Sequence, residues 1–137
     1  MTISSRTNVA IVTGSSRGIG RAVAERLARD GFAVVVNHAG GAEDADTLIG
    51  EIQAAGGHAM SVQADVSDAT AVRGLFEAAG AEFGGVDALV NNAGVMMLAP
   101  IAESDDVSFD RQVAINLKEP STACGKPRFV CAMAAAS

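Results

Sequence analysis

The chain has 137 residues, of which 49% are apolar, and it contains 15 glycines. This size and composition fit one small α/β domain better than two domains. Sixteen acidic residues against ten Lys and Arg give a formal net charge of -6, which argues against a nucleic-acid partner, since a phosphate backbone attracts basic proteins. The chain also contains no tyrosine, which excludes any mechanism that needs a phenolic hydroxyl of this chain as acid or base.

The N-terminal residues and the two cysteines carry no targeting or metal-binding pattern. Residues 2–8 are polar, and the first apolar run, 9–12, is too short for the core of a signal peptide. No apolar stretch approaches the roughly 20 residues that a membrane-spanning helix needs. Cys124 and Cys131 are too few for a disulfide framework, and their spacing matches no metal-ligand pattern. We therefore expect a cytoplasmic protein without a metal site or a membrane partner.

Short apolar runs alternate with amphipathic stretches over residues 1–118, which is typical of β-α-β units on a parallel sheet. The runs are rich in Val, Ile and Ala, as strands covered on both faces should be. Strands are expected at 8–13, 32–37, 58–64 and 86–91. Helices are expected at 19–30, at 42–55, from Ser67 or Asp68 to about Phe83, and at 104–118, with Gly31, Gly56–Gly57 and Gly84–Gly85 ending the first three.

The composition changes abruptly at Glu119. Residues 1–118 contain one proline, no cysteine and fifteen acids, whereas residues 119–137 contain two prolines, both cysteines and one acid. Pro120 and Pro127 break any helix that would continue from Lys118. Neither a strand nor a helical period is legible in 119–137, although 128–133 is weakly apolar. We therefore expect one domain over 1–118 and an irregular tail.

The segment 12–20 lies where the first expected strand passes into the first expected helix, and three of its residues are glycines. Phosphate binds backbone N–H groups at a helix N-terminus when no Cβ stands in the way. Gly14 would make the turn, Gly18 would allow close approach of a phosphate, and Gly20 would allow helix-to-strand packing. The alternative is a tight β-α turn that holds glycines for geometry alone. The order of strand, loop, helix and next strand favours a dinucleotide site.

At this point the sequence resembles the short-chain dehydrogenases/reductases, over residues 8–118. The resemblance rests on four separated motifs. They are Thr13-Gly14-Ser15-Ser16-Arg17-Gly18-Ile19-Gly20, Asp65-Val66, Asn91-Asn92-Ala93-Gly94, and Asn116 within Ile115-Asn116-Leu117. It implies a Rossmann-type doubly wound parallel sheet, incomplete here with strands 3-2-1-4 only. The implied activity is NAD(P)H-dependent hydride transfer between a small-molecule carbonyl and an alcohol.

The resemblance also implies roles for the individual residues. Ser16, Arg17 and Ile19 belong to the cofactor loop with its glycines, Asp65 and Val66 contact the adenine, and Asn116 is a catalytic-site residue. Asn92, Ala93 and Gly94 border the cofactor at the end of the fourth strand. The residues alone leave alternatives open, because Asp65 could cap a helix and the segment 91–94 could be a purely structural turn.

The end of the second expected strand bears on the choice of cofactor. An NAD site usually has Asp or Glu there, and a carboxylate repels a 2′-phosphate. This chain has Asn37 and His38 instead, while Arg17 can supply the cation that the 2′-phosphate prefers. We therefore expect NADP rather than NAD, with Asn37 and His38 in the cofactor site. His38 could equally be an exposed loop residue.

Members of the family complete their catalytic site with a serine on the fifth strand and a Tyr-x-x-x-Lys motif on the next helix. Neither is present here, and of that set only Asn116 remains. We therefore expect the chain to be inactive, with a non-catalytic NADP-binding or interaction module as the alternative function. A flavodoxin-like signalling domain is a third, remote one, since it needs an acidic pocket where Gly14 and Gly18 stand.

Two explanations fit the change at Glu119. One is the loss of a single base just before its codon, because restoring a G allows residues that look like the continuation of the family's fourth helix. The other is a natural short variant, and sequencing the coding DNA distinguishes them. Either way, the fourth strand is expected to be an unpaired sheet edge that invites self-association. The family itself is usually homo-oligomeric.

Overall fold

The computed structural model describes residues 7–93, 106–107, 110 and 130–133. Five parallel strands in this part of the chain form one sheet in the order β3-β2-β1-β4-β5. The strands are β1 (Val9–Val12), β2 (Ala33–His38), β3 (His58–Gln63), β4 (Ala88–Asn91) and β5 (Val130–Met133). The helices are α1 (Gly18–Arg29), α2 (Ala42–Ala54) and α3 (Ala69–Phe83). The predicted doubly wound sheet with strand order 3-2-1-4 is confirmed.

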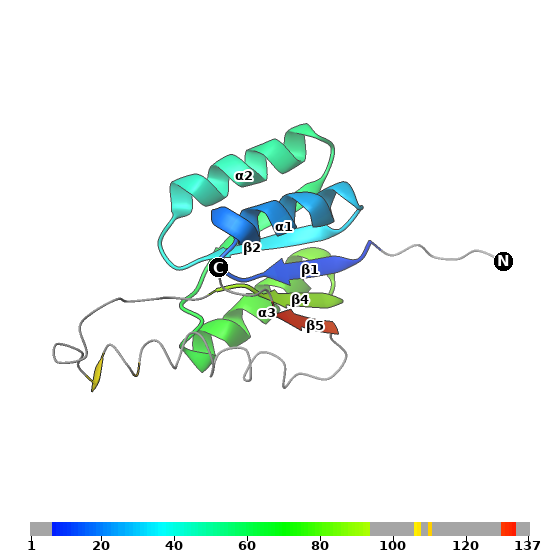
Figure 1. Ribbon diagram of the computed structural model, residues 1–137. Coiled ribbons are helices and arrows are strands. Elements are labelled where there is room, and N and C mark those ends of the chain that lie inside the picture. The colour runs from blue at the N-terminus through cyan, green and yellow to red at the C-terminus, as the bar shows by residue number, and fades with distance from the viewer. Residues whose placement is uncertain (1–6, 94–105, 108–109, 111–129, 134–137) are drawn as a thin grey trace.

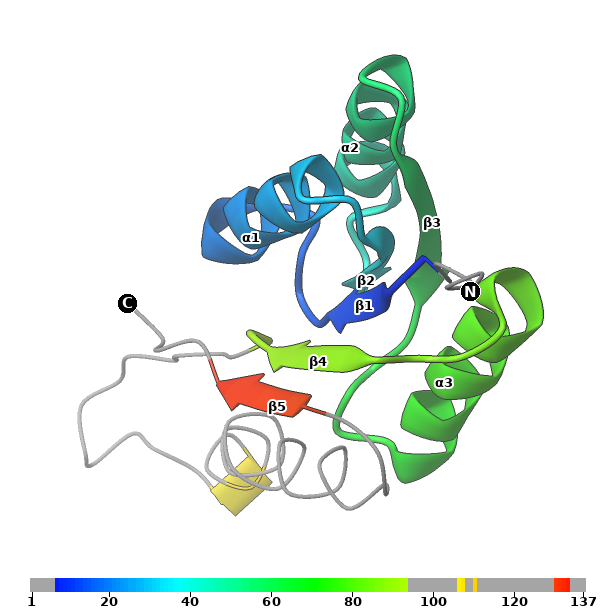
Figure 2. The same ribbon diagram turned by 90° about the vertical axis from the view of Figure 1, so that its right-hand side faces the viewer.

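The helices cover both faces of the sheet, with α1 and α2 on one face and α3 on the other (Figures 1 and 2). Alternate residues of β1 therefore enter two separate apolar cores. Val9 and Ile11 pack with Leu75 of α3, whereas Val12 packs with Leu48 of α2. Every residue of β1 and β2 is buried, which explains why these segments read as continuous apolar runs.

Helix boundaries follow the predicted signals closely. Gly31, which follows the C-cap Asp30 of α1, and Gly84, the C-cap of α3, have φ angles of 97° and 85°, in the left-handed region that favours glycine. At the start of α3 the sequence left Ser67 and Asp68 open as the cap. The structure selects Asp68, whose Oδ1 accepts a hydrogen bond of 2.9 Å from the backbone N–H of Thr70.

The structure differs from the expected irregular tail at four residues. Val130–Met133 forms β5, which pairs with β4 in the register Ala88↔Val130 to Asn91↔Met133. The prediction that the tail holds no strand and leaves β4 as an unpaired edge is therefore wrong here. A sheet edge presents unpaired N–H and C=O groups that a short extended run can use. The sequence marked this run only as weakly apolar, because four residues are too few to show a period.

The expected fourth helix, 104–118, lies outside the described residues except for Asp106, Val107 and Asp110, which have helical conformation. Among the described residues, no helix is both long enough and apolar enough to cross a membrane.

Candidate functional site

The carboxyl ends of four neighbouring strands bring together the segments 13–20, 37–38, 64–66 and 91–93, which we call the carboxyl rim. In open α/β sheets, ligands bind in the crevice outside these strand ends. The sequence placed its candidate residues on four segments that are far apart in the chain, and the strand order makes these segments neighbours. Gly94 and Asn116 lie outside the described residues.

Two glycines let the loop after β1 contact the end of β4. Gly14 has a φ of 60°, and a Cβ there would lie 3.0 Å from the Cα of Ala93. A Cβ on Gly20 would overlap the side-chain nitrogen of Asn92 and lie 2.7 Å from the carbonyl oxygen of Gly14. Gly14 makes the turn as predicted. Gly20 allows α1 to pack closely against the loop that follows β1 and against Asn92, which follows β4.

Gly18 stands in a different environment. Its φ is 64°, and a Cβ built on it would meet nothing within 4 Å. The positive φ explains why glycine fits this position. The open space in front of it is compatible with the predicted close approach of a ligand, which stays a prediction.

The N-terminus of α1 lacks the negative groups found at the starts of α2 and α3. Arg17 occupies the N-cap position with extended backbone and makes no side-chain capping bond, and the first turn contains no acid. By contrast, α2 begins with Glu43 and Asp44, and α3 is capped by Asp68. The first N–H groups of a helix have no intrahelical partner and form the positive end of its dipole. The start of α1 therefore favours an external anion.

Asn37 fixes the carboxyl rim from inside. Its side chain is 1% exposed; Oδ1 accepts a 3.2 Å hydrogen bond from the backbone N–H of Gly14. Nδ2 donates to the carbonyl oxygens of Val62 and Ala64, at 3.2 and 3.3 Å. Both amide donors are thus used within the protein. This differs from the predicted direct cofactor contact, because the side chain of Asn37 is buried and its hydrogen-bonding groups are already used by the loop and by the end of β3.

Two buried hydroxyl groups also hold the loop after β1 in place, and neither residue was predicted as a site residue from the sequence. Ser15 Oγ donates to the carbonyl of Val12 at 2.7 Å and accepts from the N–H of Asn37 at 3.2 Å. Thr13 Oγ1 accepts from the N–H groups of Asn92 and Ala93, each at 3.0 Å. The available signal was their place directly after a fully apolar strand, where a polar side chain becomes buried and needs a partner.

The residues predicted at the end of β4 hold the loop after β1. Asn92 Nδ2 donates to the carbonyl oxygens of Thr13 and Gly14, at 3.2 and 3.1 Å. Ala93 touches Gly14 through the close contact described above. Their observed contacts are therefore those of a structural turn, the alternative that the sequence left open, and a role beside a ligand stays a prediction.

Asp65 and Val66 follow β3 at the same rim. Asp65 is exposed, and its Oδ1 accepts from the N–H and the hydroxyl of Ser67, at 3.0 and 2.6 Å. It shapes the turn before α3 but does not cap that helix. The side chain of Val66 is 7% exposed and belongs to the core against α3, so only its backbone borders the rim.

The remaining predicted residues line the outer part of the rim. Arg17 and Ile19 are exposed, and Ser16 is buried with its Oγ beside Gly41, at the start of α2. His38 is not the exposed loop residue that the sequence left open, since it is 6% exposed. Its Nδ1 is buried and has no hydrogen-bond partner among the described residues. Burying a ring nitrogen without a hydrogen-bond partner costs free energy of folding, so His38 is a candidate for contact with a ligand at the rim.

A parallel sheet with a glycine-rich first β-α turn, opening onto a helix start without a side-chain cap, defines an α/β protein with a Rossmann-type fold. The family model for short chain dehydrogenases matches residues 8–126, a range that extends beyond Lys118. The chain belongs to the short-chain dehydrogenase family.

Individual relatives agree with this assignment. An uncharacterized oxidoreductase of Methylorubrum extorquens is 51% identical over 109 residues, which are 80% of this chain and 44% of the relative. The 3-oxoacyl-[acyl-carrier-protein] reductase FabG of Staphylococcus aureus is 40% identical over 112 residues, 82% of this chain and 46% of that protein. A short chain dehydrogenase from Burkholderia cenocepacia, solved in complex with NADP, is 37% identical with a TM-score of 0.83, covering 86% of this chain and 48% of that one. The chain thus spans less than half the length of these relatives.

The role of Asn37 can be tested by removing its donors. In Asn37→Asp, a carboxylate would face the carbonyl oxygens of Val62 and Ala64, so we expect the free energy of unfolding to fall by about 1–3 kcal/mol. Hydrogen exchange at the amide of Gly14 should accelerate with it. Asn8→Asp, at an exposed position, is the matched control for urea unfolding and exchange. Equal losses in both variants would contradict the assigned role.

Proposed function

We propose that the carboxyl rim binds NADP(H), with the pyrophosphate at the start of α1 and the 2′-phosphate beside Arg17. The observation that carries the proposal is the helix start described above, which has neither a capping side chain nor an acid in its first turn. The open space at Gly18 supports the same location, because a phosphate can approach the backbone where no Cβ intervenes.

The choice of NADP over NAD rests on the end of β2 and on Arg17. A carboxylate at the end of β2 would bond the ribose hydroxyls of NAD and repel a 2′-phosphate, but this chain has Asn37 and His38 there. Arg17 is exposed and forms no ion pair within the described part of the chain. Solved relatives from Burkholderia cenocepacia and from metagenomic sources were crystallised with NADP or NADPH, which supports the proposal by analogy.

The other candidate residues receive positions along the same cofactor. His38 Nδ1 would hydrogen-bond the adenosine ribose or its phosphate, which would satisfy a nitrogen that otherwise stays unpaired. Asp65 and the backbone of Val66 would contact the adenine. Asn92, Ala93 and Gly94 would border the nicotinamide half, and Ile19 would supply an apolar contact at the first turn of α1.

For the reaction, the parent activity of the family moves a hydride from the reduced nicotinamide to a carbonyl carbon, while a proton goes to the carbonyl oxygen. Bound NADPH supplies the hydride and the protein must supply the proton. This chain has no tyrosine, and of the catalytic set that the resemblance implies it contains Asn116 alone. We therefore propose that the 137-residue chain holds the cofactor without reducing a carbonyl. The alternative from another class is an interaction module that binds no cofactor.

Titration with NADPH and NADH separates these possibilities. The reduced nicotinamide is excited at a wavelength at which protein side chains do not absorb, so the emission of the bound cofactor can be followed directly. We expect Arg17→Ala to raise the Kd for NADPH about tenfold, because one charge-assisted contact with the 2′-phosphate is lost. The Kd for NADH should change by less than about twofold. Arg26→Ala is the control, since Arg26 lies at the other end of α1 and pairs with Asp30 at 3.2 Å. Tighter binding of NADH by the unmodified chain would overturn the choice of NADP.

Gly18 provides a second, steric test. Gly18→Ala and Gly84→Ala both place a side chain at a positive φ with free space around it, so each should lose about 1 kcal/mol of stability. Only Gly18 lies at the rim, and we expect only Gly18→Ala to weaken NADPH binding. Unfolding curves and NADPH titrations of both variants provide the comparison. An equal effect on binding in both would contradict a phosphate at Gly18.

Turnover distinguishes a cofactor-binding chain from an enzyme. We expect no oxidation of NADPH above the rate without protein, measured at 340 nm against a panel of ketones. A saturable, protein-dependent rate would show that another group on this chain carries the proton. Absence of NADPH binding would instead favour the interaction module.

A further inference from the structure

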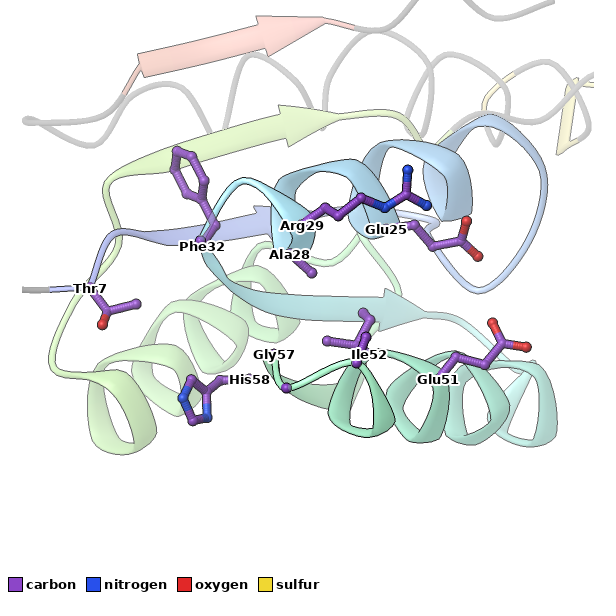
Figure 3. Close-up of a pocket in the computed structure, with 12 residues that line it drawn as sticks. Thr7, Glu25, Ala28, Arg29, Phe32, Glu51, Ile52, Gly57 and His58 are labelled. Carbon is purple, nitrogen blue, oxygen red and sulfur yellow. The ribbon is translucent and has the colours of Figure 1, made fainter.

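A hollow lies at the opposite edge of the sheet, where the strands begin. It is a pocket of about 640 Å³ between the C-terminal ends of α1 and α2 (Figure 3). Both helices run back from the carboxyl rim, so their last turns meet at this amino edge (Figure 1). Its volume lies within the range typical of small-molecule sites. No candidate residue from the sequence belongs to it, and it is separate from the carboxyl rim.

Two glycine turns leave the pocket open. α1 ends with the N–H of Gly31 donating to the carbonyl of Ala28, and α2 ends with the N–H of Gly57 donating to the carbonyl of Ile52. A Cβ on Gly57 would approach Ile52 Cγ2 to 2.8 Å, so the backbone turns tightly against this side chain. Ala28, Ile52 and Phe32 give the pocket an apolar wall. An apolar body of a ligand can therefore be buried here.

At one end of the pocket, two carboxylates share one arginine. Glu25 and Glu51 both line the pocket, and both pair with Arg21: Nε lies 3.2 Å from Glu25 Oε1, and Nη2 lies 2.6 Å from Glu51 Oε2. Arg21 itself is outside the lining. Its hydrogen bonds, first to Glu51 and then to Glu25, raise the pKa of Arg21, so it stays charged. One guanidinium thus serves two carboxylates.

The helix ends add to this negative charge. The last turn of α2 contains no basic residue, although the C-terminal end of a helix favours a cation. Glu51 stands near that end, where a negative charge is least favourable. α1 is different, because Arg26 and Arg29 lie in its last turn. On the α2 side of the pocket the last helical turn thus supplies no positive charge of its own, and Glu51 shares Arg21 of α1 with Glu25.

We propose that this pocket binds a small organic cation with an apolar body, its ammonium group beside Glu51 and Glu25 and its body against Ile52 and Phe32. The proposal is independent of the proposed cofactor binding, because the two sites lie at opposite edges of the sheet. Figure 3 shows the side chains of Glu25 and Glu51 facing the same end of the pocket. Arg29 and His58 also line the pocket, and Arg29 would oppose the cation.

Three compounds with the same phenyl body test the proposal. They are 2-phenylethylammonium, phenylacetate and 2-phenylethanol, titrated into the ¹⁵N-labelled chain. We expect saturable shifts from the ammonium compound at the amides of Gly31, Gly56 and Gly57, and binding at least about fivefold weaker for the other two. The amide of Gly84, far from the pocket, is the reference. Saturating NADPH should leave these shifts unchanged.

Variants that remove one charge show whether the pocket attracts or repels the ammonium group. Glu51→Gln keeps an oxygen for Arg21 but removes the charge, so the ammonium compound should bind about two- to fivefold more weakly. Arg29→Gln should strengthen its binding by about twofold. Glu43→Gln, in the first turn of α2, is the matched control and should change nothing. Ala55→Trp should abolish the shifts by filling the pocket from an exposed lining position.

Any of four results would overturn the proposal. They are the absence of saturable shifts, equal binding of all three compounds, tighter binding of phenylacetate, and shifts confined to the carboxyl rim. Thermal unfolding of each variant shows whether it is folded. If Glu51→Gln unfolds, the comparison of the three compounds on the unmodified chain still decides the outcome.

Discussion

The carboxyl rim depends on one buried amide. Asn37 uses its acceptor on the backbone of Gly14 and both donors on the carbonyls that end β3, so the first turn cannot move without breaking these bonds. A buried amide that meets all of these groups holds two strands and a loop in one geometry. The arrangement that leaves the start of α1 free for an anion follows from it, because Ser15 and Asn37 fix the loop that leads into this helix.

Much of the fold could be predicted because its signals are local. Apolar runs marked four strands, and Gly31 and Gly84 marked helix ends through the φ values that only glycine adopts easily. The fifth strand could not be predicted in this way, since pairing with β4 is a tertiary effect and four residues carry no period. A strand that exists only through its neighbour is invisible to a pattern read along the chain.

For the candidate site, the sequence selected segments that the strand order brings together at one rim, but it predicted only part of the roles that their residues have there. It grouped Asn37, Asn92 and Ala93 with residues that touch a ligand, whereas their observed partners are protein groups. A residue type and a position cannot reveal which side chains become buried, and burial decides whether an amide is already used. Thr13 and Ser15 were missed for the same reason. Arg17 and Ile19, by contrast, are exposed, which is compatible with the contacts proposed for them.

The close approach of Gly14 to Ala93 has a consequence for how such a sequence can change. A Cβ on Gly14 would lie 3.0 Å from the Cα of Ala93, and a Cβ on Gly20 would overlap the side chain of Asn92. Substitutions in the loop after β1 and in the segment after β4 are therefore not independent. A larger side chain in one segment requires a smaller side chain or a backbone shift in the other. A library that randomised the loop alone would sample mostly unfolded chains, whereas one that varied 14, 20, 92 and 93 together could find new combinations. Whether a substitution at this rim is tolerated therefore depends on the residue at the paired position.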